Sequence, residues 1–220
     1  MLYYILLVCQ PLDTGSMLKI DKQDSVRARK TRETRQSLCR HAYTVFAEKG
    51  YSEASIDEIV QRAGVTKGAL YHHFPDKLQL YRAVVQDMAQ GLVSTIEAAA
   101  DSQSDPWHRL EAMCNAYLDA CQSSDVQRVL VVDAPTVLGW KAWCDINKET
   151  SIGALASCLR DAMAAGQIDE QSSENLAQLI GGALNVAARV IVEAPNLSEA
   201  RTTVGHSMER LLGGLRRTQD

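Results

Sequence analysis

The side chains with the most potential for chemistry lie together in the N-terminal third of the chain. Thr66, Lys67 and Gly68 occupy what reads as the first turn of a helix, where free backbone N–H groups and the helix dipole favour a phosphate. Gly68 lets the backbone approach closely, and Ser55 is able to cap its own helix and touch phosphate with the same end. His72, one turn further on, is the best candidate for a contact with a base edge. These residue types indicate binding of a polyanion.

Catalysis, metal binding and redox sensing are the alternatives for such residues. His72 and His73 are adjacent on a helix, so their side chains point about 100° apart and make a poor metal pair. Cys114 and Cys121 share a helical face and are compatible with an oxidant or metal sensor, but cysteine is also a common buried hydrophobe, which is the interpretation we favour. No acid, base and nucleophile converge in the pattern. We therefore predict that the protein is not an enzyme and binds no metal or cofactor.

Length and composition fit a helical globular protein. The chain has 220 residues, which suits one or two domains. Hydrophobic residues make up 46% of it and aromatic residues only 5%, and the frequent alanine and leucine favour helix. No apolar run approaches the ~18–20 residues of a membrane-spanning helix. Six cysteines without a C-x-x-C pair favour reduced thiols and a cytoplasmic location.

The net charge of −4 conceals two regions of opposite sign. Residues 17–90 carry 13 Lys+Arg against 9 Asp+Glu, whereas residues 91–220 carry 10 against 17. The arm Lys22–Arg40 holds seven basic residues and two acidic ones, which suits contact with phosphates or the minor groove; a solvated tail is the alternative. This asymmetry predicts a module that binds a polyanion, joined to an acidic module with another task.

Two short helices are predicted to position the candidate donors. Apolar residues recur with helical period along the chain, without strand-like alternation of useful length. The short helices cover residues 56–63 and 66–74, with Ser55 and Thr66 as N-caps. Gly64 between them is able to adopt the positive φ of a tight turn. This is the form of a helix-turn-helix, whose second helix enters the major groove of DNA.

The neighbouring segments carry further helix signals. A first helix is predicted to stop at Gly50, and Ser55 with Glu58 has the form of a capping box. A longer helix is predicted over Asp76–Ala100, beginning at the donors and continuing into the acidic region. Another is predicted over Ala142–Ala165. The long helix at 76–100 is the natural lever between the two modules.

The wider pattern around the two short helices resembles the N-terminal domain of TetR-family transcriptional regulators. The matching residues are Phe46-x-x-Lys49-Gly50-Tyr51, Ser55-Ile56-x-x-Ile59, the run AGVTKGALYHHF over 63–74, and Lys77-x-x-Leu80. Their spacing is that of the family. Val60 departs from the alanine usual at the close contact between the two helices, which affects the local packing angle.

The resemblance implies an all-α homodimer with a three-helix DNA-binding head and a larger domain for ligand binding and dimerisation. It implies a phosphate contact for the Tyr71 hydroxyl, and Lys77 resembles the family's phosphate-binding lysine. Other interpretations stay open for the histidines and the tyrosine. A solvated surface position is the alternative for His72, and Tyr71 and His73 are alternatively edge residues of the core, His73 facing inward beside Phe74.

The acidic region carries large apolar side chains at helical spacing, which serve either as core or as the lining of a ligand cavity. The candidates for ligand contact are Trp107, Met113, Tyr117, Trp140, Trp143, Asn185 and Arg189. Helices near 176–191 and 198–215 are predicted to form the dimer interface, because small residues such as Gly182 allow a partner helix to approach closely. A core helix within one subunit is the alternative.

We predict an all-α fold in three parts. Residues 1–16 form a non-native or disordered extension, because their apolar run is too short to span a bilayer and would be exposed, and Met17 is the expected start. Residues 17–76 form a helix-turn-helix DNA-binding domain, and residues 77–220 a ligand-binding and dimerisation domain. The predicted function is a sequence-specific repressor of transcription that binds double-stranded operator DNA until a small-molecule effector binds. A ligand-independent architectural DNA-binding protein and a helical enzyme are the alternatives.

Overall fold

The computed structural model describes the backbone of residues 14–217 and the side chains of residues 28–217. Its elements in chain order are α1 (Thr14–Glu53), α2 (Ile56–Ala63), α3 (Lys67–His73), α4 (Lys77–Asp101), α5 (Pro106–Ala120), η1 (Val126–Asp133), α6 (Ala134–Leu138), α7 (Trp140–Asn147), η2 (Lys148–Ile152), α8 (Gly153–Ala164), α9 (Ser173–Glu193) and α10 (Leu197–Gly213). The segments η1 and η2 are π-helical, with wider turns than an α-helix. Within 14–217 the chain has no strand, so the predicted all-α fold is confirmed.

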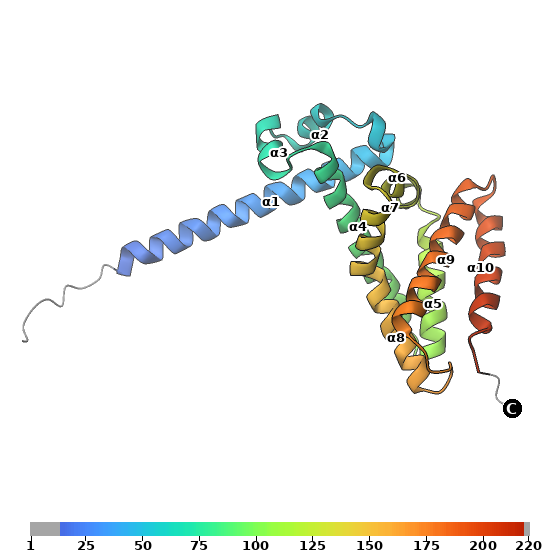
Figure 1. Cartoon of the computed structure of the whole chain (residues 1–220). Helices are drawn as coiled ribbons and strands as arrows, with labels where there is room; N and C mark the ends of the chain where they lie inside the picture. The colour runs from blue at the N-terminus through green and yellow to red at the C-terminus, as the bar shows by residue number, and fades with distance from the viewer. Residues whose placement is uncertain (1–13, 218–220) are drawn as a thin grey trace, which may run out of the picture.

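The molecule has a head and a body. Helices α1 to α3 form the head at one end of α4, and the later helices pack beside α4 as an elongated body (Figure 1). Gly50 (φ 76°) ends the straight part of α1, and Gly64 (φ 66°) turns the chain between α2 and α3, both in the left-handed region that favours glycine. Thr66 accepts a hydrogen bond from the backbone N–H of Ala69 at 3.2 Å. The predicted turn and the predicted start of the second helix are confirmed.

The predicted capping box at the start of α2 is half formed. The hydroxyl of Ser55 accepts a hydrogen bond from the backbone N–H of Glu58 at 3.2 Å, as expected. The Glu58 carboxylate instead accepts hydrogen bonds from Lys49 and Arg62. Bonds to charged donors are stronger than a bond to a neutral backbone amide, so the two cations hold this carboxylate.

The basic arm is helical. Helix α1 begins at Thr14, within the segment 1–16 that the sequence assigned to an extension, and includes the whole of Lys22–Arg40. Figure 1 shows this part of α1 projecting from the head as one helix. Residues 1–13 lie outside the described residues, so the disordered extension and the start at Met17 stay predictions.

The two longer helices predicted from the sequence have different outcomes. The helix predicted over 76–100 is confirmed as α4. The helix predicted over 142–165 is divided into α7, η2 and α8. In η2 the Thr150 hydroxyl donates a hydrogen bond to the carbonyl of Ile146 at 2.8 Å, and such bonds from a hydroxyl to the preceding turn loosen a helix. The sequence pattern has the correct period but does not reveal this wider turn.

Two large clusters of buried apolar side chains hold the fold. The first joins the head to α4, η1 and α7, and includes Leu38, Phe46, Ile59, Leu70, Tyr81, Val129 and Trp143. The second fills the body and includes Leu110, Leu118, Leu159, Ile180, Ile191, Met208 and Leu212. Because the first cluster contains residues beyond position 76, the predicted boundary at 76 falls inside one packed unit.

Helix α9 is long and apolar enough to cross a membrane, judged by length and composition alone. In the sequence it is not a continuous apolar run, because polar residues such as Asn185 and Arg189 interrupt it. In the body, residues such as Ile180 and Ile191 of this helix are buried against neighbouring helices. This is the position of a core helix in a globular protein.

Candidate nucleic-acid interface and effector cavity

Helix α3 presents its first turn and one face to solvent. Leu70 is fully buried and fastens α3 to the head. The exposed members of the predicted DNA-binding set are Ser55, Thr66, Lys67, Gly68, Tyr71 and His72. Tyr71 is 49% exposed, so its ring and hydroxyl are accessible to a large partner. The structure therefore places six of the seven predicted residues where DNA could reach them.

An ion pair joins the first turns of α2 and α3. The ammonium of Lys67 lies 2.7 Å from Oδ1 of Asp57, and both side chains are more than half exposed. This pair brings the N-terminal end of α2, with Ser55, beside the first turn of α3. The hydrogen bond to Asp57 raises the pKa of Lys67. The sequence analysis did not single out Asp57, which places a carboxylate where a phosphate is expected.

Lys77 is half-buried at the first turn of α4. Its ammonium donates a hydrogen bond to the carbonyl of Ser52 at 3.3 Å and lies 4.4 Å from the centre of the Tyr51 ring. Burial lowers the pKa of Lys77. These contacts fasten α4 to the segment that follows Gly50. A phosphate would have to draw the side chain away from them, so the structure gives Lys77 a structural role beside the predicted one.

The two histidines of α3 lie in different environments. His73 is half-buried, its ring centre is 6.5 Å from that of Phe74, and burial lowers its pKa. Phe74 is buried beneath the Arg35 guanidinium, 4.9 Å from the ring centre. His72 is exposed. His73 therefore has the inward-facing position that was one of the two alternatives, and His72 is the histidine available to a base.

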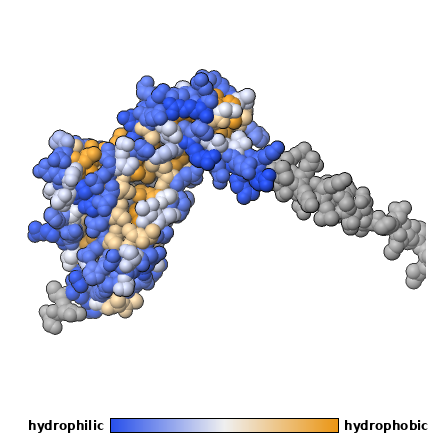
Figure 2. All heavy atoms as spheres, turned by 180° about the vertical axis from the view of Figure 1, so that it is seen from behind, coloured by the Kyte–Doolittle hydropathy of each residue, from blue (hydrophilic) through white to orange (hydrophobic). Residues whose placement is uncertain are grey.

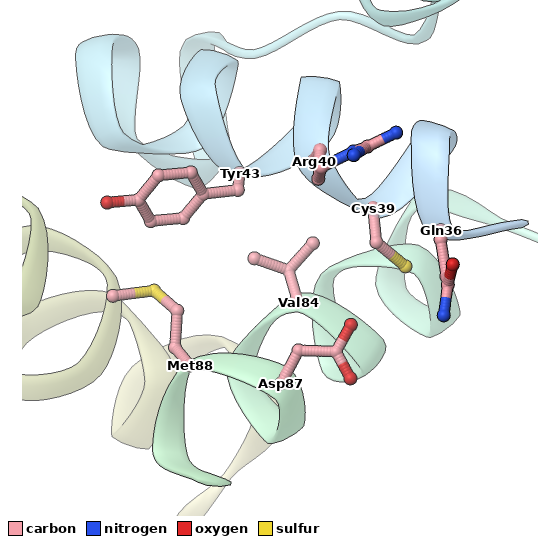
Figure 3. Close-up of a pocket in the computed structure, with 7 residues that line it drawn as sticks. All are labelled: Gln36, Cys39, Arg40, Tyr43, Val84, Asp87 and Met88. Carbon is pink, nitrogen blue, oxygen red and sulfur yellow. The ribbon is translucent and has the colours of Figure 1, made fainter. Parts of the chain in front are cut away.

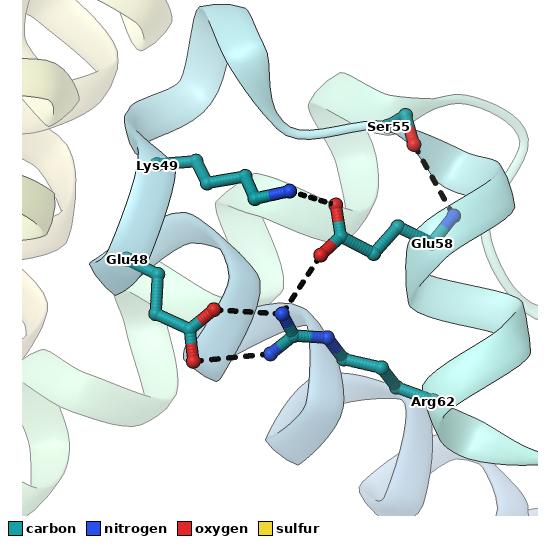
Figure 4. A network of polar contacts seen from close by, with 5 residues as sticks. All are labelled: Glu48, Lys49, Ser55, Glu58 and Arg62. Atoms are coloured by element: carbon teal, nitrogen blue, oxygen red, sulfur yellow. Dashed lines mark hydrogen bonds and ion pairs between the residues drawn. The ribbon is translucent and has the colours of Figure 1, made fainter.

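A network of ion pairs fixes α2 against α1 (Figure 4). Arg62 donates to both oxygens of Glu48, at 3.1 and 2.7 Å, and to Glu58 at 2.7 Å. Lys49 donates to Glu58 at 2.6 Å. These hydrogen bonds lower the pKa of Glu48 and of Glu58. Because Arg62 and Lys49 are neutralised here, they orient the helices and leave phosphate binding to the donors around α3.

Three hydrogen bonds attach η1 to the head and to α4. They run from Tyr43 Oη to Asp125 Oδ2 (2.5 Å), from the Tyr51 N–H to Asp133 Oδ2 (2.8 Å), and from Tyr81 Oη to the Val129 carbonyl (2.9 Å). They hold both ends and the middle of η1. A Cβ on Gly50 would lie 3.2 Å from Asp133 Oδ2, so glycine also permits this close approach. The sequence shows η1 only as a short apolar run.

Two adjoining cavities lie inside the body, and we call the pair the bundle cavity. Both are lined by Ile96, Tyr117, Asn147 and Ser151. The first, of about 50 Å³, extends to Met113 and Asn185, and the second, of about 20 Å³, extends to Leu130, Val131 and Trp143. Four of the predicted ligand residues line the cavity, namely Met113, Tyr117, Trp143 and Asn185. The sequence analysis missed Asn147 and Ser151, which carry no pattern of their own.

The other three predicted ligand residues do not line the bundle cavity. Trp107 is fully buried in the helix core and donates to Glu111 at 2.7 Å. Trp140 is 67% exposed. Arg189 pairs with Glu193 at 2.9 Å on an exposed face of α9. Residue type alone does not say which face of a helix a side chain occupies, so the structure does not bring these three residues together with the other four.

The cysteines of α5 belong to the core. Cys114 and Cys121 are both buried, and burial raises the pKa of each thiol to about 12. A protonated, buried thiol reacts slowly with oxidants and binds metals poorly. The structure therefore favours the buried-hydrophobe interpretation over the sensor.

A groove of about 430 Å³ separates α1 from α4 near the head (Figure 3). Its lining consists of Gln36, Cys39, Arg40, Tyr43, Val84, Asp87 and Met88. Figure 3 shows the Cys39 thiol directed toward Asp87. Burial and the neighbouring carboxylate raise the pKa of Cys39 to about 11. This groove differs from the bundle cavity in carrying charged side chains of both signs, and no predicted site residue lines it.

A row of apolar residues on α9, together with Leu211 of α10, is exposed within one subunit. Leu179, Val186 and Val190 are 71%, 64% and 49% exposed, and Leu211 is 54% exposed. A Cβ on Gly182 would meet nothing within 4 Å. Seen from behind, the head is mostly hydrophilic, whereas hydrophobic atoms reach the surface of the body (Figure 2). We call the set Leu179, Gly182, Val186, Val190 and Leu211 the outer strip.

Two family models match the two parts of the chain. The model described as bacterial regulatory proteins of the tetR family matches residues 38–84, and the tetracyclin repressor-like C-terminal domain matches residues 107–215. The transposon Tn10 TetC protein of Escherichia coli is 31% identical over 166 residues, covering 76% of this chain and 82% of its own. The transcriptional activator FasR of Mycolicibacterium smegmatis is 44% identical over 87 residues, 40% of each chain.

Solved structures have the same fold. A TetR-family transcriptional regulator from Pectobacterium atrosepticum is 32% identical, with a TM-score of 0.79 over 87% of this chain and 98% of its own. RolR, solved in complex with resorcinol, is 21% identical, with a TM-score of 0.66 over 84% of this chain and 90% of its own. The protein is therefore a DNA-binding regulator of transcription, and the chain belongs to the TetR family.

Proposed function

We propose that the protein is a sequence-specific repressor that binds a pseudo-palindromic operator as a homodimer and leaves it when a small molecule enters the bundle cavity. The observation that carries the DNA-binding part is the exposed first turn and face of α3, held by buried Leu70. An α-helix fits the major groove, where each base pair presents a distinct pattern of donors and acceptors.

The donors around α3 divide into two roles. Ser55, Thr66, Lys67 and the N–H groups beside Gly68 are suited to phosphate oxygens, which fix the register of the protein on the duplex. The Tyr71 hydroxyl and, once released from Ser52, Lys77 add to them. His72 is the side chain that reads a base edge. The helical arm of α1 adds basic charge, which strengthens binding to any sequence and makes it sensitive to salt.

The outer strip supports a two-fold dimer. Burying each large apolar side chain contributes about 1.5–3 kcal/mol, and a two-fold axis uses the strip of both subunits. Gly182→Trp should separate the subunits, because an indole overfills a close helix contact. Gly91→Trp is the matched control. A Cβ on Gly91 also meets nothing within 4 Å, and Gly91 lies on α4, away from the outer strip. A Gly182→Trp protein that sediments as a dimer would place the interface elsewhere.

Relief by a ligand follows from the position of η1. One side of η1 lines the bundle cavity through Leu130 and Val131, and hydrogen bonds from Tyr51 and Tyr81 attach the segment to the head and α4. A molecule that enlarges the cavity would displace η1 and change the spacing of the two heads. Release requires that the ligand binds this altered state more tightly than the DNA-bound one.

Two further readings of the function are distinguishable from this one. FasR is named as an activator, so the sign of regulation is settled only by measuring transcription. A ligand-independent architectural protein would need no cavity and would be basic throughout, unlike the acidic body. RolR was solved with resorcinol, which supports a small molecule as the effector here.

The test of the DNA-binding proposal is selection of operator sequences from random duplexes by the purified protein. His72→Ala should relax the base preference at one position of each half-site, while Tyr71→Phe should weaken binding to every sequence. Gln103→Ala, exposed at the far end of α4, is the control and should leave both properties unchanged. A uniform loss of affinity in His72→Ala, with preference retained, would assign His72 to the backbone.

A further inference from the structure

The wall of the bundle cavity contains no ionised side chain. Its polar residues are Cys114, Tyr117, Asn147, Thr150, Ser151 and Asn185, and the remaining lining residues are apolar. Burial raises the pKa of the Cys114 thiol to about 12 and that of the Tyr117 phenol above its usual value, so both are neutral near neutral pH. A molecule inside this wall meets hydroxyl, amide and hydrocarbon groups and no counter-charge.

Other hollows in the described part of the chain contain charged side chains. The groove between α1 and α4 contains Arg40 and Asp87. The hollow at the end of α8 contains Arg160, Glu170 and Glu174, and a further one is formed by residues 165–167 with 216–217, including two arginines. The bundle cavity contains none of these charged side chains, although Asp, Glu, Lys and Arg make up 23% of the sequence.

Polar groups gather where the two halves of the cavity meet. Tyr117, Asn147 and Ser151 line both halves. The Tyr117 hydroxyl donates to Oδ1 of Asn185 at 2.9 Å, and the Ser151 hydroxyl donates to the carbonyl of Asn147 at 3.3 Å. Hydroxyl and amide groups both donate and accept hydrogen bonds. A ligand with one polar group can therefore replace the hydrogen bond between Tyr117 and Asn185 by bonds of its own to both side chains, so that neither is left without a partner.

We propose that the bundle cavity selects an uncharged, mainly apolar molecule that carries one hydroxyl, carbonyl or amide group, held by Tyr117 and Asn185. The inference rests on the proposed function in that the cavity is taken as the effector site. An ion placed here would lose its hydration with no opposite charge to replace it, which outweighs the burial of its apolar part. A neutral molecule loses little and gains from the hydrocarbon wall.

The ligand must also enlarge the cavity. Volumes of about 50 and 20 Å³ are far below the roughly 300–1,000 Å³ of ligand pockets in general. The η2 segment, none of whose residues is fully buried, lines both halves through Ser151. Moving η2 outward therefore breaks few buried contacts, and we expect the cavity to open on this side. A rigid aromatic molecule with a single polar substituent is a suitable probe of such an opening.

The test compares three naphthalenes that carry substituents of different charge at the same position, namely 1-naphthol, 1-naphthoate and 1-naphthylmethylammonium. Binding to the full chain without DNA is measured by isothermal titration calorimetry at neutral pH. The neutral naphthol is expected to bind at least about tenfold more tightly than either ion. Equal or tighter binding of an ion, or no heat from naphthol near its solubility limit, overturns the proposal.

Two variants test the polar anchor. Asn185→Leu and Tyr117→Phe should each weaken naphthol binding about five- to tenfold, while unsubstituted naphthalene should bind no worse. Gln178→Leu is the matched control, because Gln178 is exposed on the same helix and does not line the cavity. Circular dichroism verifies that each variant folds. If Asn185→Leu does not fold, Tyr117→Phe still tests the anchor. Unchanged naphthol affinity in a folded variant overturns the anchor.

A second experiment tests regulation separately from the class of ligand that binds. Release of operator DNA by naphthol is measured by electrophoretic mobility. Selective naphthol binding without release supports the ligand class and contradicts relief by the cavity. Release by naphthoate at lower concentration than by naphthol supports relief and overturns the ligand class.

Discussion

The head and the body are built to different standards of packing. Where the head meets α4, Phe46 and Tyr81 are fully buried with their rings edge to face at 4.9 Å, and within the head an ion-pair network fixes α1 against α2 on the surface. The body contains the bundle cavity and the two π-helical segments. A surface that binds DNA by sequence needs side chains in fixed positions, whereas a cavity that changes shape when a ligand binds needs looser packing.

The segment η1 belongs to both regions. Its residues Val129 and Leu130 pack in the same core as the head, while Leu130 and Val131 also line the cavity. Because interiors are close-packed and resist gradual deformation, a displacement of η1 has to be passed on to the head. The difference in packing therefore allows the loose region to act on the firm one through a shared element.

The largest expected effect compares equal truncations in the two regions. Leu70 is fully buried in the head, and Leu184 lies at the bundle cavity with 8% exposure. Leu70→Ala should lower the free energy of unfolding by about 3–5 kcal/mol, and Leu184→Ala by about 2–3 kcal/mol, because a side chain beside an existing void has fewer contacts to lose. Urea unfolding followed by circular dichroism measures both. Equal losses would mean that the body is as well packed as the head.

The next effect concerns the shared element. In Asp133→Ala the N–H of Tyr51 loses its acceptor, so we expect a loss of about 1–3 kcal/mol in the free energy of unfolding. Exchange of the Tyr51 amide hydrogen should accelerate more than that of amides within α9. Asp169→Ala, which removes an exposed pair with Arg217, is the control. Unchanged exchange at Tyr51 would show that η1 and the head are held by apolar packing alone.

The sequence predicts elements that depend on local signals and fails where the tertiary arrangement decides. The caps at Ser55 and Thr66 and the turn at Gly64 were predictable, because each is a property of three or four consecutive residues. The π-helical turns were not, because the wider hydrogen-bond spacing of η1 and η2 depends on how these segments pack against their neighbours. Asp133 reaches Tyr51 across 82 positions, and no local pattern reports such a contact.

The same distinction explains the site residues. Five of the seven predicted DNA-binding residues, Thr66 to His72, lie on α3 and its N-cap, so the spacing alone places them close together. The ligand set depends on which faces of several helices meet. The cavity is lined by Met113, Tyr117, Trp143 and Asn185. Trp140, a tryptophan like Trp143 and only three positions from it, is 67% exposed. Lys77 was predicted from its resemblance to the family's phosphate-binding lysine, whereas its contact with Ser52 required the fold.

A smaller effect tests whether the surface network stabilises the head. The lowered pKa values of Glu48 and Glu58 mean that the folded state favours their ionised forms. This stabilisation is complete above the unfolded value of 4.5 and is lost as pH falls through the lower folded values. The melting temperature of the wild type should therefore fall more steeply below about pH 4.5 than that of Glu48→Gln. Glu209, which is exposed on α10, provides the control: Glu209→Gln should keep the wild-type dependence of the melting temperature on pH.

The smallest effect concerns the carboxylate at the proposed DNA-binding surface. Asp57 pairs with Lys67 at 2.7 Å with both side chains largely exposed, so a phosphate has to displace it and is also repelled by it. Asp57→Asn should strengthen binding to all duplexes about two- to tenfold and steepen the dependence on salt by up to about one unit, since one more cation is free for phosphate. Asp101→Asn makes the same charge change at an exposed carboxylate of the body, which pairs with the partly buried Arg109. If both variants strengthen binding equally, the gain comes from net charge; if only Asp57→Asn does, the carboxylate restrains the head from binding DNA without regard to sequence.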